Sequence, residues 1–346
     1  MNAPNPFLSV IVPAHQAAAF LPDTLEALAQ SDLPRERWEL IVVDDASRDA
    51  TATVASKWAD RVVSLDAPAH GPGFARNSGA DAGRGAWLVF LDADVRVHPD
   101  TLRRFVETIE QNPGMDAMFG AYDDDPTEAG FLSRYRNLLH RYVHLQGAGE
   151  SETFWAGCGA VRRSTFVAVG GFDAVRYPRP QIEDIELGYR LRDHGFHILL
   201  RPEIQGTHLK RWTFGGALRT DLFDRGIPWV RLLLERERLT RPAGLNLRQG
   251  ESFKIALVLT GILLLLLAGP TGQARLLFPA GAALALVLAS NHALIRWFFR
   301  KEGPLFALAV LPLNLWYYAI SGAAVAAGLV LHLSRRRLVT PEEVNP

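Results

Sequence analysis

Short apolar runs alternate with helical patterns through the first hundred residues of the chain. Four runs rich in β-branched and aliphatic residues have the length of buried strands: 8–13, 40–43, 61–65 and 87–91. Helical spacing of apolar residues covers 21–30 and 73–82, and Ser47 or Asp49 is a suitable N-cap for a further helix that extends to Trp58. Continuous apolar strands separated by helices predict a largely parallel sheet that is covered on both faces.

The last third of the chain has a different pattern. It contains three long stretches with almost no charge: 253–269, 276–295 and 305–333. Their lengths, together with nearby Trp and Tyr residues and basic clusters between them, predict membrane spans rather than buried helices of a large soluble core. Pro312 and Asn314 interrupt the third stretch, which either crosses the membrane or bends within it. A simple third span conflicts with the positive-inside rule at 335–337, so both alternatives stay open.

Two further segments combine apolar and aromatic residues at helical spacing with arginines. They cover 131–146 and 229–239. Basic amphipathic helices with aromatic residues lie in the interface of membranes and favour anionic lipids. The alternative is a helix that faces a protein core and presents a solvated basic face. We expect the second segment, which precedes the first apolar stretch, to lie at the membrane surface.

Charge is unevenly distributed, although the chain of 346 residues is neutral, with 37 basic and 37 acidic residues. This balance excludes the basic signature of a nucleic-acid-binding protein. Residues 1–100 carry fourteen acidic and eight basic side chains, whereas 201–250 carry five acidic and ten basic ones. The one cysteine, Cys158, excludes a disulfide framework, and we expect a structural thiol in a reducing compartment. The first ten residues lack the basic region of a signal peptide, so we expect the first 250 residues to be cytoplasmic.

Two acidic clusters follow directly on predicted buried strands. Asp44 and Asp45 end one strand, and Asp92 and Asp94 follow another. Burial of carboxylates is unfavourable without a counter-charge, and ligands of parallel sheets bind beyond the carboxyl ends of the strands. Helix capping is the alternative for a single aspartate. Because hard oxygen ligands favour Mg²⁺ or Mn²⁺, the clusters predict a divalent cation that bridges a diphosphate to the protein.

Five sequence elements in this order resemble a family 2 glycosyltransferase with the GT-A fold. They are VIVP at 10–13, VDDAS at 43–47, FLDAD at 90–94, GGFD at 170–173 and EDIELGYRL at 183–191. The resemblance covers roughly 7–212, and the order and spacing of the elements make it specific. It implies a Rossmann-like α/β domain with a mixed, largely parallel sheet, a nucleotide-sugar half and an acceptor half.

The resemblance implies a role for each matching residue. Pro13 and Asp44 or Asp45 hold the nucleobase and ribose, Arg76 and Asp92 contact the nucleotide, and Asp94 binds the metal. Asp184 is the catalytic base, which removes a proton from the acceptor hydroxyl as it attacks the anomeric carbon, with inversion. The acceptor-side residues are Trp155, Gly157 and Glu183, and a helix N-terminus alone also explains acidic residues at 183–184.

The segment His208-Leu209-Lys210-Arg211-Trp212 resembles the Gln-x-x-Arg-Trp element of processive synthases, with His in place of Gln. His208 completes a metal site with Asp94 or is a structural or phosphate-contacting residue. Lys210 and Arg211 are candidates for the diphosphate, because both side chains suit phosphate oxygens. Trp212 either stacks on the acceptor side or packs against the protein.

These patterns predict a catalytic domain at 1–212 with halves at 1–100 and 101–212, interfacial helices at 213–252, an all-α membrane domain with about three helices at 253–333 and a polar tail at 334–346. We expect a multi-pass protein of the cell inner (plasma) membrane. Its predicted activity is the metal-dependent transfer of a sugar from a UDP- or GDP-linked donor to a lipid acceptor at the cytosolic face. The alternatives are a processive polysaccharide synthase and an inactive membrane scaffold of the same fold. No pattern in the sequence indicates an oligomeric state.

Overall fold

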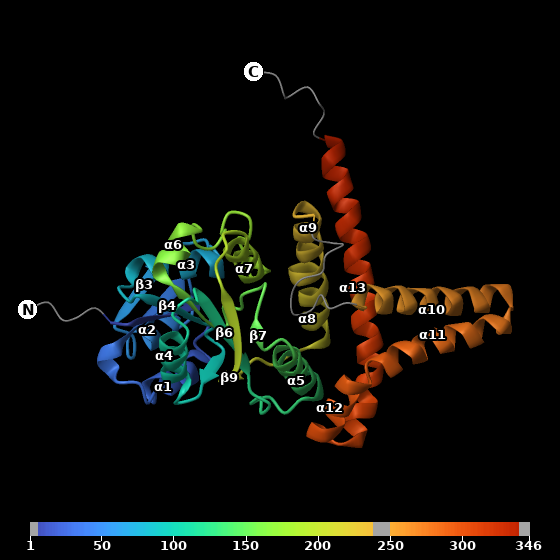
Figure 1. Ribbon diagram of the computed structural model, residues 1–346, viewed down its shortest axis with the longest axis horizontal. Coiled ribbons are helices and arrows are strands. Elements are labelled where there is room, and N and C mark those ends of the chain that lie inside the picture. The colour runs from blue at the N-terminus through green and yellow to red at the C-terminus, as the bar shows by residue number, and fades with distance from the viewer. Residues whose placement is uncertain (1–5, 238–249, 339–346) are drawn as a thin grey trace, which may run out of the picture. The chain divides into compact units, whose positions relative to one another are not determined.

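The computed structural model describes residues 6–237 and 250–338 (Figure 1). The chain divides into two compact units, Met1–Arg211 and Trp212–Pro346. The division falls next to the predicted end of the catalytic domain.

Strands and helices alternate through the first unit, as the sequence predicts. In chain order they are β1 (Leu8–Ala14), α1 (Leu21–Ala29), η1 (Arg35–Arg37), β2 (Trp38–Asp45), α2 (Thr51–Ala55), β3 (Arg61–Leu65), α3 (Pro72–Ala82), β4 (Trp87–Leu91), β5 (Val95–Val97), α4 (Thr101–Gln111), β6 (Ala117–Tyr122), α5 (Phe131–Gln146), β7 (Gly149–Glu150), β8 (Cys158–Arg162), α6 (Arg163–Ala168), α7 (Glu183–Asp193) and β9 (Ile198–His208). α2 begins at Thr51, whose N–H donates to Oδ1 of Asp49 at 3.0 Å, so of the two suggested caps it is Asp49 that lies at the start of the helix. α2 ends at Ala55, before the predicted end at Trp58.

Among the described residues, nine strands form one mixed sheet with the order β3-β2-β1-β4-β8-β6-β9-β5, and β7 pairs with β9. The pairs β3-β2, β2-β1, β1-β4 and β6-β9 are parallel, whereas β8 runs antiparallel to both β4 and β6. This confirms the predicted mixed, largely parallel sheet. The first four strands bring their carboxyl ends, and the residues that follow them, to one edge of the sheet.

The central strands are buried because helices cover both faces of the sheet. Val10 belongs to a core cluster that contains Leu25 of α1 and Phe105 of α4. The next residue, Ile11, points to the other face, where α3 packs so closely that a Cβ atom on Gly79 would lie 2.4 Å from Cγ2 of Ile11. Successive residues of a strand point to opposite faces, so an uninterrupted apolar run fills both layers.

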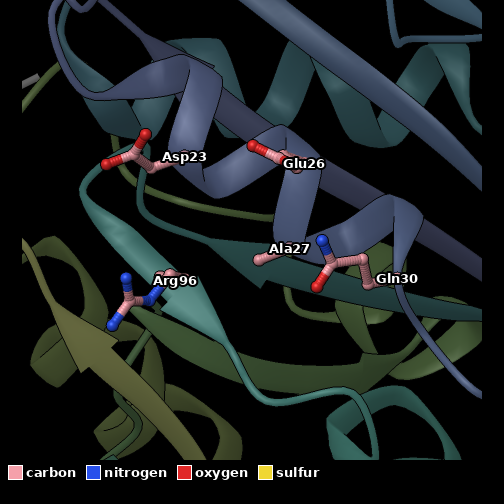
Figure 2. A pocket seen from close by; sticks show the side chains of 5 residues that line it. All are labelled: Asp23, Glu26, Ala27, Gln30 and Arg96. Atoms are coloured by element: carbon pink, nitrogen blue, oxygen red, sulfur yellow. The ribbon is translucent and has the colours of Figure 1, made fainter.

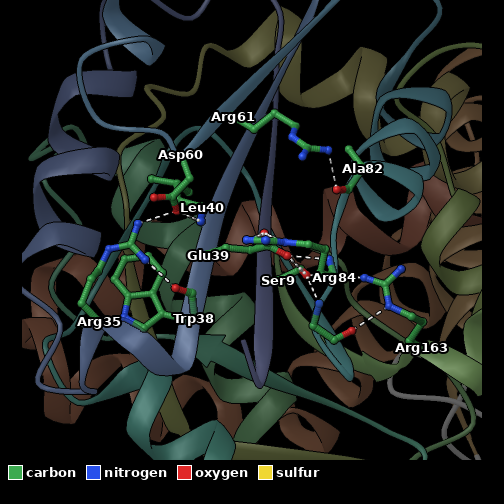
Figure 3. A network of polar contacts seen from close by, with 11 residues as sticks. Ser9, Arg35, Trp38, Glu39, Leu40, Asp60, Arg61, Ala82, Arg84 and Arg163 are labelled. Carbon is green, nitrogen blue, oxygen red and sulfur yellow. Dashed lines mark hydrogen bonds and ion pairs between the residues drawn. The ribbon is translucent and has the colours of Figure 1, made fainter. Parts of the chain in front are cut away.

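A polar network joins the amino ends of the parallel strands (Figure 3). Glu39 of β2 is 6% exposed, and its Oε1 accepts a hydrogen bond of 2.8 Å from the hydroxyl of Ser9 in β1. Its Oε2 accepts two bonds of 3.1 Å from the Arg84 guanidinium. The backbone N–H of Gly85, just before β4, donates to the Ser9 hydroxyl at 2.7 Å. This network fixes β1, β2 and β4 at the edge opposite to the acidic clusters.

The second unit is helical throughout its described residues. It contains α8 (Phe214–Arg219), the π-helix η2 (Thr220–Gly226), α9 (Ile227–Glu235), α10 (Glu251–Thr271), η3 (Ala274–Leu276), α11 (Leu277–Ser290), α12 (His292–Glu302) and α13 (Pro304–Leu338). The predicted amphipathic segment at 229–239 lies in α9 and the following turn, but its last residues, Arg238 and Leu239, lie outside the described residues.

Two described helices, Glu251–Thr271 and Pro304–Ser334, are long and apolar enough to cross a membrane, with mean hydropathies of 2.2 and 1.4. A third span results only if α11 and α12 count as one, and they bend by 63° at their junction. The apolar stretch at 276–295, which the sequence predicts as a span, therefore contains a bend at Asn291. In contrast, α13 continues through Pro312 as one helix, although a bend was an alternative there. Leu263 and Leu266 of α10 are 56% and 67% exposed, which fits a lipid environment.

A polar cluster joins α10, the junction of α11 and α12, and α13. The side-chain amide of Asn291 donates to Oδ1 of Asn314 at 2.9 Å and to the hydroxyl of Tyr318 at 3.1 Å. The Tyr318 hydroxyl donates to Glu251 at 2.9 Å, and the Lys254 ammonium donates to both Glu251 and Asn291 at 2.8 Å. Since buried polar groups need hydrogen-bond partners, this cluster fixes the three segments against one another.

Candidate active site

The acidic clusters meet at one edge of the sheet, as the sequence predicts. Asp44 pairs with Ala14, the last residue of β1, in the β1-β2 ladder. Asp92 follows β4, the other neighbour of β1, and its backbone N–H donates to the carbonyl of Gly157 at 3.1 Å. Pro13 lies beside Val43 at the same edge. The parallel topology therefore brings the candidate nucleobase and diphosphate residues to the loops beyond these strands.

Hydroxyl side chains join the loop after β1 to the segment that follows β2. The backbone N–H groups of Gln16 and Ala17 donate to the hydroxyls of Ser47 and Thr51 at 2.9 and 2.8 Å. The sequence suggests Ser47 as a helix cap, but its hydroxyl caps the neighbouring loop instead. The donor, Gln16, lies 31 residues away in the chain, and no local sequence pattern indicates such a pairing.

The carboxylate of Asp45 organises the loop that leads into α3. Its two oxygens each accept a backbone N–H at 2.8 Å, one from His70 and one from Gly71. Gly71 has φ of +90°, and a Cβ there would lie 2.6 Å from the carbonyl oxygen of Pro178. Only glycine suits this position. Asp44 has a different partner, since its Oδ1 accepts the N–H of Ser47 at 3.3 Å.

Arg76 of α3 connects the two halves of the domain. It is 4% exposed, and its guanidinium donates to Oδ1 of Asp92 at 2.7 Å and to Oε1 of Glu183 at 2.9 Å. Burial alone lowers the pKa of Arg76, but the charges of Asp92, Glu183 and Asp184 outweigh burial and hold that pKa above its usual value. Burial raises the pKa of Asp92, against the effect of Arg76. The sequence predicts Arg76 and Asp92 as separate nucleotide contacts, whereas the structure joins them in one ion-paired group with Glu183.

Asn77 adds a second connection between the halves. Its Nδ2 donates to the carbonyl of Phe172 at 2.8 Å, and its Oδ1 accepts the N–H of the same residue at 2.9 Å. These paired bonds hold the GGFD segment against α3. No pattern in the sequence indicates this role of Asn77, although it directly follows Arg76.

Asp184 lies in the first turn of α7 and faces the predicted acceptor loop. Its Oδ2 accepts the N–H of Ala156 at 3.2 Å, and its Oδ1 accepts the N–H of Ile185 at 2.8 Å. Ala156 lies between Trp155 and Gly157, and a Cβ on Gly157 would lie 2.5 Å from the Trp155 ring. The predicted base is thus oriented by the predicted acceptor loop, and the close approach of the Trp155 ring requires glycine at 157.

Asp94 and His208 form the candidate metal pair. Nε2 of His208 lies 3.7 Å from Oδ2 of Asp94, which is too long for a hydrogen bond. Two donors that are each roughly 2.1 Å from one ion lie about 3.0 to 4.2 Å apart, so this spacing fits a shared cation. Burial raises the pKa of Asp94, but contacts with His208 and the charge of Lys210 lower that pKa by more. The net pKa lies below its usual value, so the carboxylate is kept ionised.

Within the described residues, no group of three or more His, Cys, Asp and Glu side chains is arranged to hold a metal ion. The pair Asp94–His208 therefore offers two protein ligands, and a bound diphosphate would supply the remaining oxygens.

The remaining predicted residues lie near the end of β9 or in the sheet. Lys210 and Arg211 follow β9 and are exposed, while Trp212 begins the second unit.

Cys158 is buried at the start of β8, and burial, with a smaller effect of Asp92, raises the pKa of its thiol. A buried thiol with a raised pKa is inert, in line with the expected structural role.

A hollow of about 410 Å³ lies elsewhere on the first unit (Figure 2). It is lined by residues of α1 and by Arg96 of β5: Asp23, Glu26, Ala27, Gln30 and Arg96. None of these residues belongs to the predicted nucleotide, metal or acceptor groups. The hollow is therefore not lined by the candidate active-site residues, although Arg96 lies two positions after Asp94 in the sequence.

Comparison with known proteins finds the same family that the sequence elements resemble. Residues 9–170 match the family model described as glycosyl transferase family 2. The glycosyltransferase AglE of Haloferax volcanii is 27% identical over 230 residues, which cover 63% of this chain and 72% of that protein. The succinoglycan biosynthesis protein ExoO of Rhizobium meliloti is 40% identical over 116 residues, but these span only 32% of its length.

Solved structures are similar in fold. The mannosyltransferase PcManGT from Pyrobaculum calidifontis, in complex with GDP-Man and Mn²⁺, superimposes with a TM-score of 0.56 at 20% identity and covers 96% of this chain and 88% of that one. TarS of S. aureus, in complex with UDP-GlcNAc, gives a TM-score of 0.51 at 18% identity over 95% of this chain and 91% of that one. At these identities the likeness concerns the fold.

Proposed function

Since the chain carries a family 2 glycosyltransferase domain at residues 9–170, we propose that it transfers one sugar from a nucleotide-linked donor to a lipid acceptor at the cytosolic face of a membrane. The observation that carries this proposal is the meeting of three groups at one edge of the sheet. They are the Asp45-ordered loop, the ion-paired group around Arg76, and Asp184 in its contact with the acceptor loop.

The donor side of the proposed site comprises Pro13, Asp44, Asp45, Arg76 and Asp92. A UDP- or GDP-linked sugar is proposed because PcManGT and TarS, which share the fold, bind GDP-Man and UDP-GlcNAc. Asp45 acts on the donor site by ordering the backbone at 70–71, and Arg76 holds Asp92 in place. Lys210 and Arg211 provide flexible positive charge for the diphosphate.

Asp94 and His208 are proposed to hold a divalent cation, Mg²⁺ or Mn²⁺, together with the diphosphate. When bound, the cation neutralises the charge that develops on the departing diphosphate. The spacing of 3.7 Å between the two side chains supports this role, as does the Mn²⁺ bound to PcManGT.

Asp184 is the proposed base. It accepts the proton of the acceptor hydroxyl while that oxygen forms a bond to the anomeric carbon and the bond to the nucleoside diphosphate breaks. Attack opposite to the leaving group inverts the anomeric configuration. Trp155, Gly157, Glu183 and Trp212 are proposed acceptor-side residues, and Glu183 acts there by fixing Arg76 beside the base.

A lipid acceptor at a multi-pass membrane protein is supported by the two apolar helices of the second unit and by the apolar, Trp-bearing α9. We propose the cell inner (plasma) membrane, with domains at 1–212, 213–252, 253–333 and 334–346. Transfer of a single sugar, rather than polymer synthesis, is favoured by His208 in place of the Gln of processive synthases.

The test is a donor screen with the full chain in detergent. Radiolabelled UDP- and GDP-linked sugars are supplied with Mn²⁺ and with polyprenyl phosphate, glycerolipid or sphingolipid, and the label in the organic phase is counted. At least one donor should give a lipid product, and Asp184→Asn should lower its rate by at least about a hundredfold. Asp193→Asn, at the exposed end of the same helix, is the matched control. Full activity of Asp184→Asn, or no lipid product with any donor, contradicts the proposal.

A further inference from the structure

Tyr122 stacks on the imidazole of His208. The two ring centroids lie 4.3 Å apart with an angle of 16° between the planes, and the residues are 8% and 6% exposed. Tyr122 ends β6 and pairs with Gly206 of β9, two residues before His208. The sheet therefore sets the distance between the rings, and the stacked geometry sets the plane of the imidazole.

Aromatic rings from two other segments of the chain pack against Tyr122. His140 of α5 lies 4.5 Å from the Tyr122 ring centroid, and Trp155 makes an edge contact at 4.8 Å. His140 packs on His144 at 3.9 Å, and Nδ1 of His144 lies 3.0 Å from the carbonyl oxygen of Gly120 in β6. Tyr122 is thus enclosed on several sides, so its ring has little freedom to turn away from His208.

The plane of the His208 ring decides where its Nε2 points. In the observed orientation Nε2 lies 3.7 Å from Oδ2 of Asp94, the spacing that suits a shared cation. Rotation of the imidazole about its χ angles would move Nε2 away from the carboxylate. Groups that orient a metal-binding histidine commonly act through its other ring nitrogen, and the contact with Tyr122 adds a constraint on the face of the ring.

We propose that Tyr122 is a positioning residue of the metal site: its ring holds the His208 imidazole so that Nε2 and Asp94 present two preoriented ligands to a divalent cation. The inference rests on the proposed function, in which Asp94 and His208 bind that cation. Tyr122 itself touches neither the metal nor the substrate. Its effect on cation binding passes entirely through His208.

The experiment measures Mn²⁺ affinity directly rather than turnover. The full chain in detergent is titrated with Mn²⁺ in the presence of UDP or, separately, GDP, and free Mn²⁺ is followed by electron paramagnetic resonance. Tyr122→Leu, which removes the planar ring, should weaken Mn²⁺ binding about tenfold. Tyr122→Phe keeps the ring and should bind like the native protein. Melting temperatures identify misfolded variants, and Tyr122→Met, with a similar volume but no ring, carries the same expectation if Tyr122→Leu does not fold.

A double-variant cycle separates this proposal from its premise. His208→Ala should weaken Mn²⁺ binding, and adding Tyr122→Leu to it should have no further effect. Native Mn²⁺ affinity in Tyr122→Leu, or additive losses in the double variant, would overturn the role of Tyr122 while His208 remains a ligand. Native affinity in His208→Ala would overturn the metal role of His208 and this inference with it. Absence of nucleotide-dependent Mn²⁺ binding by the native chain would overturn the proposed metal site as a whole.

Discussion

Replacement of Arg76 by methionine tests whether the ion-paired group at the centre of the first unit holds its two halves together. Met fills most of the volume of Arg but leaves Asp92 and Glu183 without their shared cation. Removing one partner of a buried ion pair costs about 3–5 kcal/mol, because the remaining charge stays buried. Glu183 is 4% exposed and bears this penalty, whereas the side chain of Asp92 is 32% exposed and can be rehydrated. We therefore expect Arg76→Met to lose about 3 kcal/mol of unfolding free energy.

For a unit of this size a loss of 3 kcal/mol lowers the melting temperature by about 6–12 °C. The assay is differential scanning calorimetry of the full chain in detergent, with hydrogen exchange of the α3 and α7 amides identifying the unit that melts. Glu183→Gln added to Arg76→Met should restore about 1–2 kcal/mol, because the buried charge is then gone.

An exposed ion pair supplies the matched control. Arg37 lies 3.1 Å from Glu110, with side chains 41% and 58% exposed, and Arg37→Met should change the stability by less than about 1 kcal/mol. A melting temperature of Arg76→Met close to that of the control would refute the reasoning. So would a double variant that is less stable than Arg76→Met alone.

Three further predictions concern other parts of the molecule. Burial raises the pKa of Glu39, but hydrogen bonds from Arg84 and Ser9 and the charge of Arg84 outweigh burial and hold that pKa below its usual value. The stabilisation is therefore present above the usual pKa and is lost as the pH falls through the lowered one. Urea unfolding should find Glu39→Gln about 1–2 kcal/mol less stable than the native chain at pH 7, and this difference should shrink as the pH is lowered; a constant difference would contradict this. Gly71→Ala places a Cβ 2.6 Å from a backbone oxygen at a φ of +90°. Calorimetry should find weaker UDP or GDP binding and a loss of about 1–3 kcal/mol in stability. Native binding and stability would show that the loop is not constrained. Asn291→Leu removes the centre of the polar cluster and should destabilise the second unit by about 1–2 kcal/mol in thermal melts. Ser290→Ala, at an exposed neighbouring position, should leave the stability unchanged. Equal effects of the two substitutions would argue against a stabilising role of the cluster.

Comparison of α2 and α13 with their predictions shows where local patterns mislead. Ser47 and Asp49 are both good helix caps in isolation, but only Asp49 accepts the N–H of Thr51 at the start of α2, whereas the hydroxyl of Ser47 serves the loop after β1. In the second unit, Pro312 suggests a bend, yet α13 continues through it, and the break falls at Asn291 instead. At Ser47 a partner that is distant in sequence competes with the local preference.

The sequence by itself determined the class of fold and the edge of the sheet at which the candidate site lies. Apolar runs of strand length, each ending in a loop, specify parallel strands, and parallel strands carry Asp44, Asp45, Asp92 and Asp94 to one edge whatever the details of packing. The apolar stretches of the last third likewise indicate membrane helices by length and composition alone.

Only the tertiary structure decided how these residues are paired. Glu183 binds Arg76 from 107 positions away, and Tyr122 stacks on His208 although the two belong to different strands. Such contacts arise because the fold closes long loops and buries both partners together. Periodicity and propensity describe only near neighbours, so they carry no information about which distant side chains meet.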